Sequence, residues 1–83
     1  MKLHNLKIKD EYFSEVVQGK KKAELRKNDR RYNKDDLIHF INIYGDDFFG
    51  CDDNLYIITH VLENVSDYGL KDGYCILSIE RLK

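Results

Sequence analysis

The sequence predicts a small α+β domain in which a barrel-like sheet of about five strands packs against one helix. Strand-like and helix-like patterns follow one another in the order β-α-β-β-β-β. The chain contains no proline that would interrupt a strand, and several strands carry apolar side chains on both faces. With 83 residues it has room for one hydrophobic core, so we expect a single domain over residues 1–83.

The first two elements are a strand and a short helix. Polar and apolar side chains alternate over residues 3–9, the period of a strand with one wet face. Asp10 offers a side-chain acceptor as the N-cap of the helix, and Gly19 supplies the left-handed residue that ends it. One face of this helix is apolar and consists of Phe13, Val16 and Val17.

Four further strands follow. Residues 22–27 alternate again, with Ala23 and Leu25 on one face and Lys22, Glu24 and Arg26 on the other. Residues 37–44 are apolar on both faces, which indicates a central strand, and two more β-forming runs complete the sheet at 55–62 and 74–82. The segments 28–36, 45–54 and 63–73 are rich in Asp, Asn or Gly, which predicts turns and loops.

Charge is distributed very unevenly along the chain, although the net charge is only −1. Residues 20–34 hold eight basic side chains and two acidic ones, whereas residues 35–72 hold nine acidic side chains and one lysine. Cations gathered at a helix end and along one strand face suit phosphate groups. The same run is also typical of a solvated face that keeps a domain soluble.

Several side chains near this basic run have both a functional and a structural interpretation. Arg26 and Arg30 could each grip a phosphate or a guanine edge through two hydrogen bonds. Glu24 could read a base amino group or act as a general base, or it could belong to an ion-pair ladder on the strand. The aromatic residues that could stack on a base or cap the core are Tyr32, Tyr44, Phe48 and Phe49.

Other function classes lack support in the sequence. The three histidines and the two cysteines, Cys51 and Cys75, show no metal-ligand spacing, so we expect free thiols, no metal and no cofactor. The sequence contains no glycine-rich phosphate loop, and no catalytic set is evident in it. Without a membrane span or a secretory signal, we expect a cytoplasmic protein.

Three ordered motifs give the chain a family resemblance. A His-x-Leu-Lys-Ile run occupies residues 4–8, a Gly-Lys-Lys segment followed by Glu-x-Arg-Lys-Asn-Asp-Arg occupies 19–30, and Tyr-Gly-Leu-x-x-Gly-Tyr occupies 68–74. Together they resemble the ASCH branch of the PUA-like superfamily, and within it a family of short prokaryotic and phage proteins of unknown function. The resemblance implies a small β-barrel with flanking helices.

The resemblance also implies a function, because ASCH domains are thought to bind RNA in a cleft lined by the Gly-x-Lys segment. The pocket residues that it implies are Lys21, Glu24, Arg26, Asn28, Asp29 and Arg30. Strand alternation adds Lys22, which lies on the same predicted face as Glu24. We therefore expect a module that binds RNA or a modified nucleotide through a basic cleft.

Two other functions stay open. Some ASCH relatives are amidohydrolases that deacetylate acetylcytidine with a lysine, a threonine and a later glutamate. Lys21 matches the lysine and Glu63 is the candidate glutamate, but Lys22 and Glu24 stand where the threonine would be. An enzyme would then use Lys21 and Glu24 as an altered acid/base pair. The third function is a protein-interaction adaptor anchored by Phe48 and Phe49.

Overall fold

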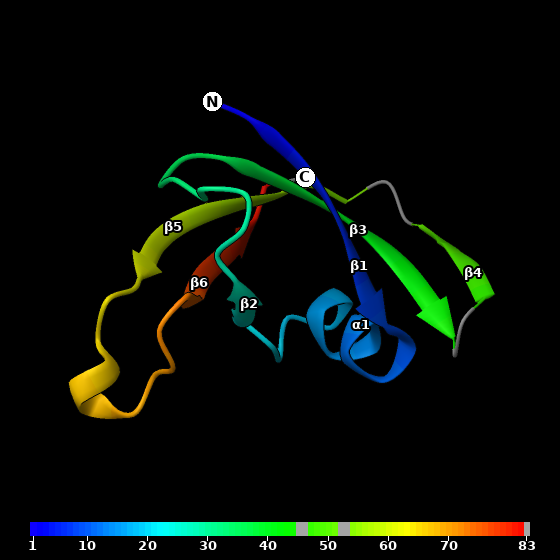
Figure 1. Ribbon diagram of the computed structural model, residues 1–83. Coiled ribbons are helices and arrows are strands. Elements are labelled where there is room, and N and C mark those ends of the chain that lie inside the picture. The colour runs from blue at the N-terminus through cyan, green and yellow to red at the C-terminus, as the bar shows by residue number, and fades with distance from the viewer. Residues whose placement is uncertain (45–46, 52–53, 83) are drawn as a thin grey trace.

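The computed structural model shows one curled sheet with a single α-helix against it (Figure 1). It describes residues 1–44, 47–51 and 54–82, and in the segment 47–51 the backbone alone. The elements, in chain order, are β1 (Leu3–Lys9), α1 (Asp10–Val17), β2 (Ala23–Lys27), β3 (Leu37–Tyr44), β4 (Asp47–Cys51), β5 (Tyr56–Leu62), the 3-10 turn η1 (Ser66–Tyr68) and β6 (Tyr74–Arg81).

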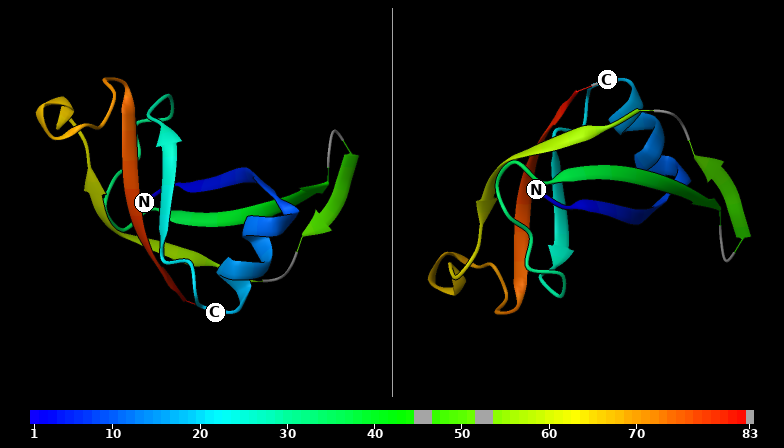
Figure 2. Two further views of the ribbon diagram at one scale, coloured as in Figure 1. Left: turned by 90° about the horizontal axis from the view of Figure 1, so that it is seen from below. Right: turned by 90° about the horizontal axis from the view of Figure 1, so that it is seen from above.

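The strands are ordered β1-β3-β5-β6-β2, and β4 pairs with β3 beside this path. β1 runs parallel to β3, while the other pairs are antiparallel, so the sheet is mixed. The sheet curls so that β1 and β2, its two ends, approach each other without a ladder between them in the described chain (Figure 2). The predicted fold class is confirmed in the form of a half-barrel, and the open side between β1 and β2 is called the seam below.

The first two elements match their predicted ranges closely. In β1, His4, Leu6 and Ile8 are buried while the residues between them are exposed. The predicted N-cap is wrong, because Lys9 precedes the helix and its side chain forms no cap bond. Asp10 is instead the first helical residue, and its Oδ1 accepts a hydrogen bond of 2.9 Å from Nδ2 of Asn42 on β3. A tertiary contact thus takes the carboxylate that a local cap would use.

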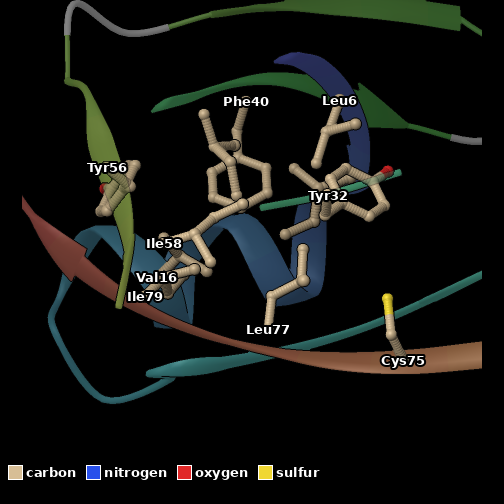
Figure 3. Packing of buried hydrophobic residues seen from close by; sticks show 11 residues of the cluster. Leu6, Val16, Tyr32, Phe40, Tyr56, Ile58, Cys75, Leu77 and Ile79 are labelled. Carbon is tan, nitrogen blue, oxygen red and sulfur yellow. The ribbon is translucent and has the colours of Figure 1, made fainter. Parts of the chain in front are cut away.

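The core lies inside the curl, where α1 places Val16 against side chains from the strands (Figure 3). Its largest members are fully buried, among them Phe40 and Ile58. The α1 helix has only eight residues, too few for stability on its own, so it depends on this packing. Gly19 ends it with the predicted left-handed geometry, at a φ of 77°.

Residues 45–54 were expected to form a loop, and this expectation is wrong for part of the segment. β4 occupies Asp47–Cys51 and pairs with the far half of β3 in an antiparallel ladder. The strand arises from this pairing, which the four aspartates and two glycines of residues 45–54 do not reveal. Among the described residues, no helix is long and apolar enough to cross a membrane.

Candidate nucleotide-binding groove

β2 turns its charged face into the half-barrel and its apolar face out to solvent. Glu24 is 6% exposed, whereas Leu25 is 60% exposed. The cross-strand register sets Glu24 beside the buried Leu77 of β6 and Leu25 beside Ile76. The charged face of β2 is thus buried and its apolar face exposed, the reverse of an ordinary strand at the surface. Burying a carboxylate is unfavourable unless its charge is compensated, so this reversal identifies β2 as the strand that carries the candidate site.

Two cations compensate the charge of Glu24. The Nζ atom of Lys21 lies 2.5 Å from Oε1 of Glu24 and also donates to the carbonyl of Ala23. Arg26 donates from Nε to Oε2 of Glu24 at 2.9 Å, and its Nη2 lies 2.7 Å from the same oxygen. The sequence predicted Lys22 as a neighbour of Glu24 on this face, but the ion pair is formed by Lys21. The Lys21, Glu24 and Arg26 side chains, called the triad below, converge on one place.

Within the described chain, the contacts of the triad leave some N–H groups of its cations unpaired and occupy most of the lone pairs of its carboxylate. Both oxygens of Glu24 are engaged, and Oε2 receives two groups of Arg26. Among the described residues, one ammonium hydrogen of Lys21 and the two hydrogens on Nη1 of Arg26 have no partner. Donors held in position by a buried carboxylate are suited to an anion such as a phosphate oxygen.

Cationic side chains also close the seam. In β1, the carbonyl of Lys2 bonds toward β3, so those of Asn5 and Lys7 face the seam. Arg26 Nη2 donates to the Lys7 carbonyl at 2.6 Å, and Arg30 Nη1 donates to that of Asn5 at 3.0 Å. Unpaired strand edges are prone to pairing with other chains, so these arginines also protect the edge of the sheet.

A groove of about 420 Å³ follows the seam past the triad. Its lining includes the three triad residues together with Lys27 of β2, and Lys7, Lys9 and Tyr12 from β1 and the start of α1. We call it the seam groove. Five of its side chains are cationic and Glu24 is the single carboxylate, which a cation already neutralises. Sequence reasoning missed Lys7, Lys9 and Tyr12, because only the curl of the sheet brings β1 to β2.

The remaining predicted site residues lie apart from the triad. Lys22 is exposed and lines a different groove. Asn28 follows β2, donates to Oε2 of Glu63 at 2.5 Å and receives no bond at its buried Oδ1 from the described residues. Asp29 is exposed in the turn that follows. Since Asn28 is four residues beyond Glu24, Glu63 is held at a point about 13 Å along the chain from Glu24.

The aromatic residues that were predicted to stack on a base or cap the core differ in their burial. Tyr32 is 5% exposed and packs edge-on against His4, with ring centroids 4.8 Å apart, so it belongs to the core. Burial raises the pKa of Tyr32, although Arg26 and Arg30 nearby act in the opposite direction. Tyr44 is 66% exposed. The side chains of Phe48 and Phe49, which would anchor an adaptor, lie outside the described part of the chain.

His4 forms a buried hydrogen bond with a carboxylate, and neither residue lines the seam groove. Its Nε2 lies 2.9 Å from Oδ2 of Asp36. The Asp36 carboxylate also accepts the backbone N–H of Lys2 at Oδ1 and that of Asn33 at Oδ2. Burial alone would raise the pKa of Asp36, but these hydrogen bonds outweigh it and hold that pKa below its ordinary value. Among residues 1–44 and 54–82, no three metal-binding side chains gather at one point.

Comparison with known sequences assigns the family. The model of a domain of unknown function, DUF3850, matches residues 3–79, which include every element described above except the last two residues of β6. The chain belongs to this family. It is also similar to an uncharacterized 12.9 kDa protein encoded in the GpA 3′ region of Escherichia phage P2, with 46% identity over 37 residues. The match covers 45% of this chain and 34% of the phage protein.

Proposed function

We propose that this DUF3850 domain binds RNA or a modified nucleotide in the seam groove. The triad is the observation that supports this proposal best, because a buried glutamate orients two cations whose remaining N–H groups are available to an anion. Lys7, Lys9 and Lys27 extend the positive charge on either side of it. A phosphate held by Lys21 and Arg26 would have further cations within reach for its neighbours along a chain.

The three sequence motifs add support at the level of the superfamily. We propose that the domain is an ASCH-type member of the PUA-like group, in which the Gly-Lys-Lys segment faces the nucleic acid. The half-barrel with one helix is compatible with that assignment. The inward turn of β2 brings Lys21, Glu24 and Arg26 of this motif region to a groove, as a ligand-binding segment requires.

The hydrogen bonds that Glu24 accepts favour a binding function over hydrolysis. A general base needs a lone pair directed at the proton that it removes, and three of the roughly four lone-pair sites of Glu24 already face Lys21 or Arg26. The later glutamate of the hydrolase proposal, Glu63, is engaged by Asn28 at the far end of β2. We therefore assign Glu24 as a positioning residue that fixes the two cations.

The test is fluorescence anisotropy of a labelled single-stranded RNA over a series of salt concentrations. Lys9→Ala and Lys27→Ala remove groove cations that make no hydrogen bond within the described residues, so the fold should be retained. The slope of log K against log salt should fall by about 0.7 for each phosphate that a variant no longer neutralises. Lys34→Ala, an exposed lysine outside the groove, is the matched control. Affinity independent of salt, or equal effects of all three variants, would refute the proposal.

A further inference from the structure

A second groove adjoins the seam groove on the other side of Lys21. It measures about 430 Å³ and is formed by the end of α1, residues 21–22 and parts of β5 and β6. Of the residues that line the two grooves, Lys21 alone belongs to both. A ligand bound at the triad can therefore extend into this second groove by passing one side chain.

The lining of the second groove combines an apolar floor with a polar rim. Val16, Tyr56 and Ile79 supply the floor, and Figure 3 shows them gathered at one end of the core. The rim carries an amide, a hydroxyl, a carboxylate and cations, from Gln18, Thr59, Glu80, Lys22 and Arg81. Apolar walls with a few polar groups, in a volume of roughly 300–1,000 Å³, are typical of small-molecule sites.

Two backbone irregularities shape this groove. The register between β5 and β6 shifts between Ile58 and His60, so Thr59 is the extra residue of a β-bulge, and its side chain lines the groove. Gly19, at a φ of 77°, ends α1 at the opposite wall, where a side chain would strain the backbone. Bulges commonly redirect side chains next to binding sites. The groove is thus built by specific departures from regular structure.

We propose that the second groove binds the nucleobase of a nucleotide whose phosphate lies at the triad, an inference that rests on the function proposed above. The seam groove, with its cations, suits the charged part of such a ligand, and the second groove suits a flat, uncharged ring with polar edges. Its rim offers donors and acceptors for those edges. The expected ligand is therefore a nucleotide that the protein contacts at its phosphate and at its base, and not a phosphate backbone alone.

The first experiment compares three kinds of probe by isothermal titration calorimetry at low salt: inorganic phosphate, ribose 5-phosphate and the four ribonucleoside 5′-monophosphates. Removing the apolar faces of a base from water commonly strengthens binding by about tenfold. We therefore expect at least one monophosphate to bind about tenfold more tightly than ribose 5-phosphate.

The second experiment fills the groove. Thr59→Trp should bring the affinity for the preferred nucleotide down to that for ribose 5-phosphate and leave phosphate binding within about twofold of wild type. His60→Trp places the same bulk on the adjacent exposed residue, which does not line the groove, and should keep the base-dependent gain. Gln18→Trp, on the exposed end of α1, fills the groove from another element if Thr59→Trp unfolds.

The outcomes separate this inference from the function on which it rests. Nucleotides that bind no more tightly than ribose 5-phosphate, or that are unaffected by filling the groove, overturn the base subsite alone. If neither RNA nor any of these probes binds at low salt, the proposed function fails and the inference fails with it.

Discussion

Removing the buried carboxylate of Glu24 should destabilise the protein more than any loss of an exposed glutamate. The Glu24 side chain is 8% exposed, and its partners Lys21 and Arg26 are 25% and 22% exposed. In Glu24→Ala the two cations remain side by side without a counter-charge. Breaking a buried pair in this way costs about 3–5 kcal/mol, and leaving a cation unpaired accounts for much of that loss.

The partial exposure of the two cations reduces this value. Water can reach Lys21 and Arg26 once the carboxylate is gone, so we expect a loss of about 2–3 kcal/mol in the free energy of unfolding. For a domain of this size, that loss corresponds to a fall in Tm of about 10–20 °C. Glu24→Gln keeps the shape and removes the charge, so its effect should be smaller than that of Glu24→Ala.

Urea unfolding followed by tyrosine fluorescence provides the measurement, since the chain has six tyrosines and no tryptophan. Glu15→Ala, on the exposed face of α1, is the control and should change stability by no more than about 0.5 kcal/mol. A cycle with Arg26→Ala should give a coupling energy of about 1–3 kcal/mol. If Glu24→Ala matched Glu15→Ala, the triad would be a surface ion pair and the argument for a preorganised site would be wrong.

Three further predictions concern the rest of the fold. The pKa of Asp36 is lowered below its ordinary value of 3.8, so its contribution to stability is present above that pH and is lost as the pH falls through the folded-state pKa. In urea titrations across this range, the free energy of unfolding should fall with decreasing pH, and Asp36→Asn should reduce that fall. Phe40→Ala should lower the free energy of unfolding by about 3–5 kcal/mol, because Phe40 is fully buried, whereas Tyr68→Ala, at a residue 90% exposed, should change it little. Burial, with nearby carboxylates, raises the pKa of the Cys75 thiol; in a Cys51→Ser background, a thiol reagent should therefore modify Cys75 only as fast as the protein unfolds, and rapid labelling of the folded protein would contradict the burial.

Local patterns were sufficient to predict most of the elements. Alternation identified β1 and β2, and apolar runs identified β3, β5 and β6 within a residue or two of their ends. Gly19 was correctly predicted to end α1, because a glycine has no Cβ and adopts the left-handed conformation at little cost. These features depend on residues that are close together in the sequence, so a single amino-acid sequence is enough to predict them.

What the sequence could not reveal depends on contacts between distant segments. β4 exists because β3 offers it an edge, and Asp10 is not a cap because Asn42 lies beside it. Alternation showed that Glu24 and Arg26 share a face of β2, but the curl of the sheet decides that this face points inward. The same curl brings Lys7 and its neighbours on β1 into the groove, and no spacing along the chain marks that meeting.

The arginines at the seam affect how natural variants of this family should be interpreted. Arg26 reaches from Glu24 on its own strand to the Lys7 carbonyl on β1, and Arg30 spans the same opening to Asn5. A lysine at position 26 would preserve the charge but has one donor head and cannot bridge both partners with the same planar fork. Relatives that differ there should therefore differ in how far the half-barrel opens at the seam, even where they keep the same charge.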